Sequence, residues 1–348
     1  MKLYKLILII LIVFFKTGNV LSEENIFNVN NIEIEKKAKL NNYKLAELAI
    51  KKGFKELAEK ILLEEDIKKL SLLKISQIKE LVSYYQVVNK IDENYGLEMI
   101  NYNISFDKDK LHNLFYTKGI SYSDITNKEL FILPILKKNN KIFVFNQNYF
   151  YDNWNTIYNN ELIEFILPLE NIEIIQNVNS SKNNLLDLEL SNIFKEYTEK
   201  NLALVLIEQN NLKEEKIYFK TKILGKNIVK NIVLKKLNLN QEQFNEKIIT
   251  EIKREIINVV KSQNLIDIRI PSFLNAQLDL SKNSSLVELN LRLKKIDLIE
   301  SIYVQEFNSK SVYLKIKYLG KLDKILRQLE KEKIILKLIG DQWSIKII

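Results

Sequence analysis

The chain has 348 residues, of which 46% are hydrophobic, 10% aromatic and 28% charged, and its formal net charge is +9. This length predicts about two domains or three small ones, with enough apolar residues for sizeable cores. The sequence contains no cysteine, which excludes disulfides, thiol catalysis, thiolate metal sites and lipid attachment through a cysteine.

The positive charge comes almost entirely from lysine, because arginine occurs only at Arg254, Arg269, Arg292 and Arg327. Proteins that read nucleic acids typically use arginine to contact bases and phosphates. We therefore expect no nucleic-acid partner.

The first 22 residues have the pattern of an export signal. Lys2 and Lys5 precede an apolar run over residues 6–15, and a polar step leads to a cleavage site between Ser22 and Glu23. The run is shorter than the roughly 20 apolar residues that a membrane-spanning helix needs. We expect a periplasmic protein whose signal peptide (residues 1–22) is cleaved and which has no stable membrane span. Retention at the inner membrane by an uncleaved signal is the alternative.

Residues 23–146 are expected to form an N-terminal α+β module. Alternating apolar residues predict strands, and apolar residues spaced by three and four predict helices. The strands are expected at 26–35, 84–91, 98–106, 130–136 and 142–145, and the helices at 40–62, 76–82 and 108–118.

Residues 147–270 are expected to form a second α+β module. Its predicted strands lie at 162–169, 202–207, 217–224 and 228–234, and its predicted helices at 188–197 and 244–260. The two strands around Gly225 have the spacing of a hairpin.

Residues 271–348 are expected to form a ferredoxin-like module. Its predicted elements follow the order strand, helix, strand, strand, helix, strand, which is the ferredoxin-like order, with one further strand at the end. They lie at 273–280, 285–295, 299–307, 311–318, 322–329, 334–339 and 343–348. We interpret the last strand as an added edge strand, which could pair with a strand of a partner. The alternative is that it simply completes its own sheet.

The sequence carries no motif that assigns a reaction. No glycine-rich phosphate loop, nucleophile elbow or calcium-binding loop is present, and the single histidine, His112, has the surroundings of a structural residue. We therefore expect no cofactor and no metal. A hydrolase that uses two carboxylates stays open, because a sequence does not show the geometry of its acids.

One segment combines aromatic and amide side chains densely enough to suggest a binding surface. Asn146, Asn148, Tyr149, Tyr151 and Trp154 could form a groove for a sugar or a peptide. The alternative is a loop and a helix start, with Trp154 packed on the edge of a sheet and its N–H hydrogen-bonded.

Several features together resemble an uncharacterised family of exported proteobacterial proteins, known only as a domain of unknown function. They are the signal peptide, the helix over 45–50, the strand over 102–106, and the later segments at 133–136, 153–154 and 167–170. The resemblance is best over residues 25–210. It implies an exported protein with no known activity.

The sequence favours a non-enzymatic periplasmic factor that binds another envelope component, most simply an envelope protein. Two alternatives remain open: a carboxylate-dependent hydrolase of cell-wall glycan or peptide, and a periplasmic protein that binds a small ligand.

Overall fold

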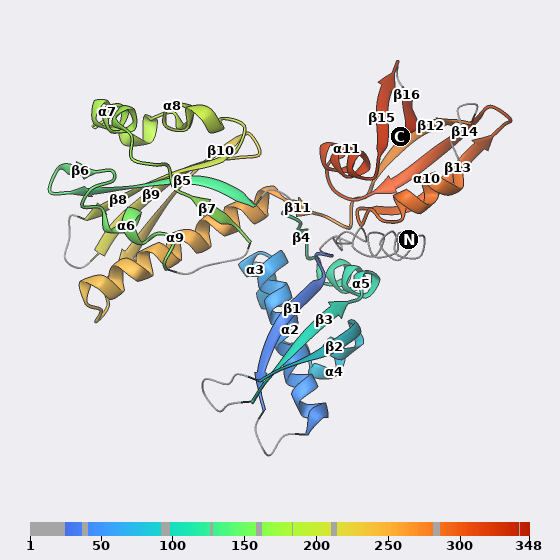
Figure 1. Ribbon diagram of the computed structural model, residues 1–348, viewed down its shortest axis with the longest axis horizontal. Helices are drawn as coiled ribbons and strands as arrows, with labels where there is room; N and C mark the ends of the chain where they lie inside the picture. Colours follow the sequence, from blue (N-terminus) through green and yellow to red (C-terminus); the bar gives the residue numbers. More distant parts are fainter. Residues whose placement is uncertain are drawn as a thin grey trace, which may run out of the picture. The chain divides into compact units, whose positions relative to one another are not determined.

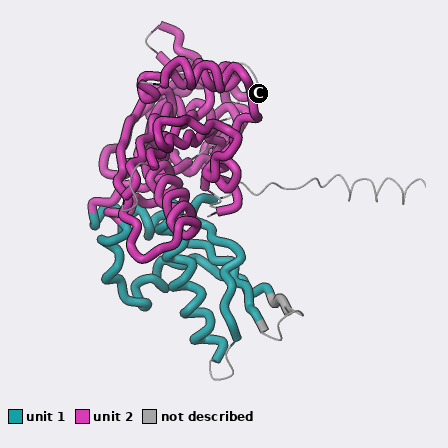
Figure 2. Tube along the Cα trace, turned by 90° about the vertical axis from the view of Figure 1, so that its left-hand side faces the viewer, with its two compact units in different colours: residues 1–61, 67–118 teal, residues 62–66, 119–348 magenta. Residues whose placement is uncertain are grey.

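The computed structural model describes residues 25–36, 41–91, 98–125, 128–157, 162–182, 184–209, 214–280, 286–340 and 342–348. The predicted signal peptide and its cleavage site at Ser22 and Glu23 lie outside these residues. The chain divides into two compact units (Figure 2). Unit 1 comprises residues up to 61 and 67–118, and unit 2 comprises residues 62–66 and 119–348. Several small sheets with helices make up the chain, so the predicted α+β fold class is confirmed (Figure 1).

Unit 1 is an antiparallel three-stranded sheet with helices, in the strand order β1-β3-β2. Its elements are β1 (Asn28–Glu35), α2 (Asn42–Ile61), α4 (Ile75–Glu80), β2 (Val82–Ile91), β3 (Glu98–Phe106) and α5 (Lys108–Lys118). The sequence predicts all six of them. It does not predict α3 (Glu64–Leu70), which begins in the segment assigned to unit 2.

Helix α2 packs closely on the sheet of unit 1. It buries one apolar stripe that includes Leu45, Ala49 and Leu57, as the helical spacing predicts. Gly53 lies at the closest approach, where a Cβ atom would stand 2.9 Å from the Cδ1 atom of Ile104. The residues of β3 that share the face of Ile104 therefore point towards α2.

The largest sheet belongs to unit 2 and has the strand order β10-β9-β8-β5-β6, with β7 also paired to β5. Its strands are β5 (Glu129–Lys138), β6 (Lys141–Phe143), β7 (Glu164–Ile166), β8 (Asn201–Gln209), β9 (Glu214–Ile223) and β10 (Lys226–Lys235). Strand β5 lies between β8 and β6, and its central residues are buried on both faces. That burial explains why its sequence is a continuous apolar run.

This sheet places the first module boundary earlier in the chain than residue 146. Strand β5 pairs in parallel with β8 from Leu130↔Asn201 to Lys138↔Gln209. A boundary at 146 would cut this sheet, and the compact units divide after residue 118 instead. Local sequence patterns do not reveal a pairing between strands so far apart in the chain.

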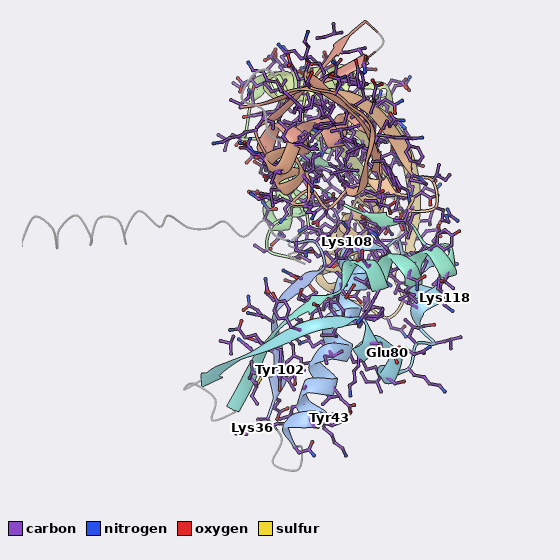
Figure 3. All side chains as sticks on the ribbon, turned by 90° about the vertical axis from the view of Figure 1, so that its right-hand side faces the viewer. Lys36, Tyr43, Glu80, Tyr102, Lys108 and Lys118 are labelled. Atoms are coloured by element: carbon purple, nitrogen blue, oxygen red, sulfur yellow. The ribbon has the colours of Figure 1, made fainter. Side chains whose placement is uncertain are left out.

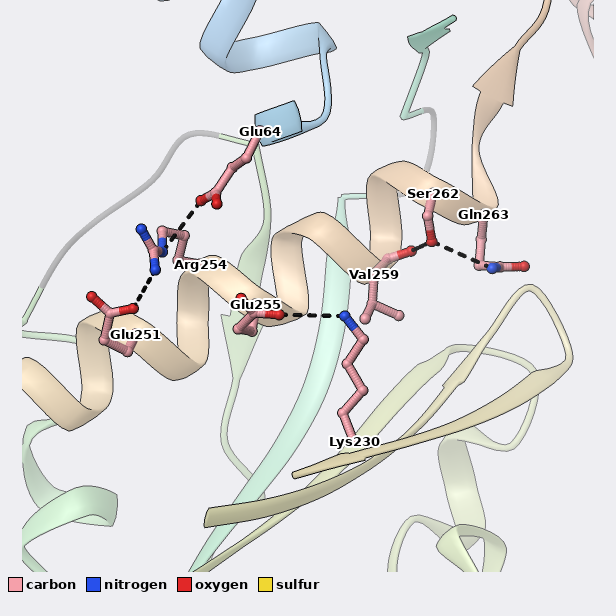
Figure 4. A network of polar contacts seen from close by, with 8 residues as sticks. All are labelled: Glu64, Lys230, Glu251, Arg254, Glu255, Val259, Ser262 and Gln263. Atoms are coloured by element: carbon pink, nitrogen blue, oxygen red, sulfur yellow. Dashed lines mark hydrogen bonds and ion pairs between the residues drawn. The ribbon is translucent and has the colours of Figure 1, made fainter. Parts of the chain in front are cut away.

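Helices cover both faces of the large sheet (Figure 1). One face packs against α9 (Gln241–Gln263), and the other against the helical segment formed by α7 (Ile172–Ser180), η1 (Leu185–Asp187), α8 (Leu190–Ile193) and η2 (Lys195–Tyr197). The single helix predicted at 188–197 is thus two short helical turns. Ion pairs join α9 to its surroundings, from Arg254 to Glu64 at 3.3 Å and from Glu255 to Lys230 at 3.3 Å (Figure 4).

The last sheet of unit 2 follows the predicted order of elements but not the predicted arrangement of strands. Its elements are β12 (Ser272–Asp279), α10 (Leu286–Leu293), β13 (Ile299–Phe307), β14 (Ser311–Tyr318), α11 (Leu322–Lys331), β15 (Ile334–Ile339) and β16 (Gln342–Ile347). The strand order is β13-β14-β12-β16-β15. Strand β16 lies between β12 and β15, so the expectation that the last strand forms an edge is wrong. The ferredoxin-like order is thereby interrupted, because β16 separates β12 from β15.

Unit 2 also contains a short two-stranded sheet, formed by β4 (Tyr122–Ser123) and β11 (Leu265–Ile266). Beside it, the Nζ atom of Lys324 on α11 lies 2.6 Å from the Oδ2 atom of Asp124. Burial lowers the pKa of Lys324, and the carboxylate of Asp124 opposes that shift. Across the described helices, none is both long enough and apolar enough to cross a membrane.

Candidate functional site: the open edge of strand β2

Two of the five predicted surface residues are core residues. Asn148 and Trp154 expose none of their surface. The Oδ1 atom of Asn148 accepts hydrogen bonds from the backbone N–H groups of Phe150 and Tyr151 and thereby caps α6 (Tyr149–Asn153). Its Nδ2 atom donates to the carbonyl oxygens of three residues, Pro134, Phe143 and Val144. Asn148 therefore joins α6 to the sheet instead of lining a groove.

The other three predicted residues are also tied into the structure. The hydroxyl of Tyr151 donates to the carbonyl oxygen of Pro168 at 2.8 Å, and its ring packs edge-on against Phe145. Asn146 is exposed and donates to a carboxylate oxygen of Glu170 at 2.8 Å. Tyr149 is half-buried in the hydrophobic core on the α9 side. A binding role for Asn146, Tyr149 and Tyr151 stays a prediction, and the segment as a whole forms no exposed aromatic surface.

The charged group against Trp154 is a buried lysine that the sequence reasoning missed. Lys253 of α9 is 1% exposed, and its Nζ atom lies 5.7 Å from the ring centre of Trp154 and 5.3 Å from that of Phe165. It donates to the carbonyl oxygen of Ile157 at 2.7 Å, and burial lowers its pKa to about 8. The sequence does contain a sign that this lysine is buried, because Lys253 falls on the apolar stripe of α9, four residues after Ile249.

The indole N–H of Trp154 has no hydrogen-bond partner among the described residues. The ring of Trp154 is therefore packed in the core, as the alternative to a binding groove predicts. That alternative also predicts a hydrogen bond from the indole N–H, and none is found among the described residues. A buried lysine and an enclosed indole offer no exposed surface for a partner.

A strand edge with several exposed apolar side chains lies in unit 1, on β2. Within the described part of the chain, β2 pairs only with β3, so its other edge has no described strand beside it in this sheet. Four large apolar side chains are exposed along it, at fractions of 62% for Tyr84, 47% for Tyr85, 47% for Val87 and 39% for Val88. We call these four residues the β2 edge.

The β2 edge is apolar on both faces of the sheet. Tyr85 and Val87 stand opposite Ile104 and Tyr102 of β3, on the face that α2 covers. The rings of Tyr85 and Tyr102 lie 6.3 Å apart, and burial raises the pKa of Tyr102. Tyr84 and Val88 stand opposite Ser105 and Asn101, on the other face. Tyr102 is labelled on the sheet of unit 1 in Figure 3.

The other long edge strands carry features that oppose pairing. Strand β1 has an irregular register between Val29 and Ile32, with Asn31 at a φ of 59°, and it ends in acidic residues. Strand β10 carries Lys226, Lys230 and Lys235 along its length. Strand β13 has two register irregularities and two glutamates, and β15 carries Lys337 near its middle. Bulges and charges of this kind are how proteins protect strand edges.

Strand β2 has less of this protection along its first half, and its one charged residue, Lys90, lies next to its end. Its register is irregular only between Val82 and Tyr84, and from Tyr84 to Ile91 it pairs without interruption. The stretch from Tyr84 to Val88 contains no charged residue and no proline. The sequence predicts this strand, but its place at an edge depends on β1, which lies far earlier in the chain.

Among the residues that the structure describes, no group of three or more His, Asp or Glu side chains is placed to hold a metal ion. What the β2 edge offers chemically is a row of backbone N–H and C=O groups flanked by aromatic and branched side chains. Those groups are suited to a protein backbone in an extended conformation.

Comparison with known proteins adds no function. No protein family matches this sequence, and no curated protein matches it. A solved structure described as "Crystal structure of uncharacterized protein" is similar over 40% of this chain and 94% of its own chain, at 8% sequence identity and a TM-score of 0.19. A score this low supports no argument about fold or function, and the resemblance to an exported proteobacterial family stays a prediction.

Proposed function

We propose that this chain is an exported, non-enzymatic envelope protein that binds an extended segment of another envelope protein along β2. Export is supported by the basic start, the apolar run and the cleavage site within residues 1–23. The observation that carries the binding function is the uncharged, apolar β2 edge.

The backbone groups of a strand edge determine which conformation a bound segment must have. Each unpaired backbone group along β2 can gain about 0.5–1.5 kcal/mol by exchanging water for a protein partner. An extended strand supplies these partners at the same spacing, whereas a helix satisfies its own backbone groups. The occupant is therefore an extended segment.

The side chains of the β2 edge define the segment further. Tyr84 and Val88 are exposed on one face, and Tyr85 and Val87 on the other. A partner strand that carries apolar residues on both of its faces covers all four, and burying each large side chain contributes up to about 1.5–3 kcal/mol. The absence of charge from Tyr84 to Val88 favours an uncharged segment.

Photo-crosslinking in the cell envelope tests this proposal. A photoreactive amino acid replaces Tyr84 in the full chain, and the cross-linked peptides are identified by mass spectrometry. We expect one adduct that maps to a single segment of another envelope protein. Val87→Lys adds a charge to the edge at a side chain that is 47% exposed and should abolish the adduct. The matched control, Val229→Lys on β10, changes a valine that is 58% exposed and should leave the adduct intact.

Three results would overturn the proposal: no adduct, an adduct that Val87→Lys does not reduce, or an adduct formed only with a second copy of this chain. A synthetic peptide of the identified segment provides a direct check. Its addition to the purified protein should slow hydrogen exchange of the β2 amides in the wild type and not in Val87→Lys.

A further inference from the structure

A polar row lies at one end of the large sheet of unit 2, on the face that α9 covers. Lys138 of β5 stands beside Gln209 of β8, and Glu215 of β9 stands beside Leu234 of β10. The antiparallel register of β8 and β9, which pairs Glu208 with Lys216, places Gln209 opposite Glu215. Because Ile207, Ile217 and Leu234 pack in the core under α9, Glu215 lies on that same face.

Hydrogen bonds between amide side chains connect the first turns of α9 to this row. Gln209 donates to the Oδ1 atom of Asn245 at 3.1 Å, and Gln241 donates to the same atom at 3.0 Å. The Nζ atom of Lys236 donates to Gln241 at 2.7 Å. Asn240 caps the helix, and its Oδ1 atom accepts from the backbone N–H of Gln243. The helix start is therefore held to the sheet by uncharged groups and one lysine.

Glu215 is the anomaly in this arrangement. It is 4% exposed, and its buried Oε2 atom has no hydrogen-bond partner among the described residues. A carboxylate in such a place is unstable, because burial without a partner opposes its charge.

The charged groups that act on Glu215 are Lys138 at the end of β5 and Lys236 after β10. Strand β8 contributes the neutral Gln209, and α9 contributes the neutral Gln241 and Asn245. The carboxylates of the first α9 turns, Glu242 and Glu246, act instead on Tyr149. Burial raises the pKa of Glu215 to about 7, and the two lysines oppose that shift without cancelling it.

We propose that Glu215 is a proton-operated latch: protonated, it lets the first turns of α9 close over the end of the sheet, and its ionisation loosens them. The neutral carboxyl remains in the dry row and can donate a hydrogen bond there. The ionised carboxylate is stabilised by water, which reaches it when α9 lifts from the row. This latch is independent of binding at β2.

The direction in which pH changes the opening of α9 follows from proton binding to Glu215. The closed state holds the proton up to a pH of about 7, whereas an exposed glutamate loses it near 4.5. The open state therefore gains on the closed state as pH rises through this window. Between pH 6 and pH 8 these two values give a roughly tenfold increase in the opening equilibrium.

Hydrogen exchange of the full chain at pH 6 and pH 8, corrected for intrinsic rates, tests the latch. In the wild type we expect about tenfold lower protection at pH 8 for amides at the start of α9 and of β9. Glu215→Gln should abolish this difference. Glu214→Gln is the matched control, because Glu214 is half-buried on the opposite face, and it should behave as wild type.

Equal protection at both pH values in the wild type would overturn the latch, as would a persistent difference in Glu215→Gln. Direct titration of the Glu215 carboxyl by NMR in the wild type guards against a variant that fails to fold. A midpoint near 7 supports the proposal, and a midpoint near 4.5 contradicts it.

Discussion

Lys253 and Glu215 are both buried on the face of the large sheet that α9 covers, and burial moves their pKa values in opposite directions. It lowers the pKa of Lys253 to about 8 and raises that of Glu215 to about 7. In each case burial disfavours the charged form. The two residues differ in their contacts, because Lys253 donates to a carbonyl oxygen and borders two aromatic rings, whereas the Oε2 atom of Glu215 lacks a partner among the described residues.

Asn148 shows the opposite case, a buried polar residue with its hydrogen bonds made. We expect Asn148→Ala to lower the free energy of unfolding by about 3 kcal/mol, because it removes a helix cap and strands buried carbonyl groups. Urea denaturation measures the change. Asn146→Ala, on the exposed neighbour that bonds only to Glu170 among the contacts described here, should cost less than about 0.5 kcal/mol. Equal losses in the two variants would contradict this role for Asn148.

At the scale of elements, the approach of α2 to its sheet depends on Gly53. The only contact of a Cβ atom there that would be shorter than ordinary van der Waals distance is with the terminal methyl of Ile104, at 2.9 Å, so a small shift of that methyl accommodates it. Alanine also gains up to about 1 kcal/mol in helix propensity over glycine. We expect Gly53→Ala to change stability by less than about 1 kcal/mol, and Gly53→Val to cost about 1–3 kcal/mol through overpacking. Urea denaturation of both variants tests this, and a valine variant as stable as the alanine one would refute it.

The elements themselves could largely be predicted from the sequence, because their signals are local. The stripe of α9 and the alternation of β3 depend on residues a few positions apart. The short helix α3 begins with three acidic residues, Glu64 to Asp66, a pattern that is also typical of a solvated loop. The apolar residues of 188–197 have helical spacing, but they pack on the sheet through two short turns, α8 and η2.

The arrangement of the strands within the sheets is harder to predict, because it depends on contacts between residues that are distant in sequence. Strand β16 was correctly placed in the chain, yet alternation does not reveal that it enters the sheet between β12 and β15. The same limit applies to the sites. Aromatic and amide density drew attention to Trp154, which is buried, whereas β2 stands out only once its lack of a second neighbour is known.

At the scale of the whole molecule, the division into two compact units predicts how the chain unfolds. Each unit has its own sheets and its own buried core. Units with separate cores can lose their structure separately, so a single two-state transition is not expected. We expect two transitions in calorimetry of the full chain.

The variants described above assign the two transitions. Gly53→Val disturbs unit 1 and should lower the midpoint of one transition by several degrees, since about 1 kcal/mol shifts a domain of this size by roughly 4–8 °C. Asn148→Ala disturbs unit 2 and should lower the other transition, leaving the first unchanged. The double variant should show both shifts and no more, because the two sites belong to different compact units. If either single variant moves both transitions together, the units unfold as one cooperative structure, and the division into separately folding parts is wrong.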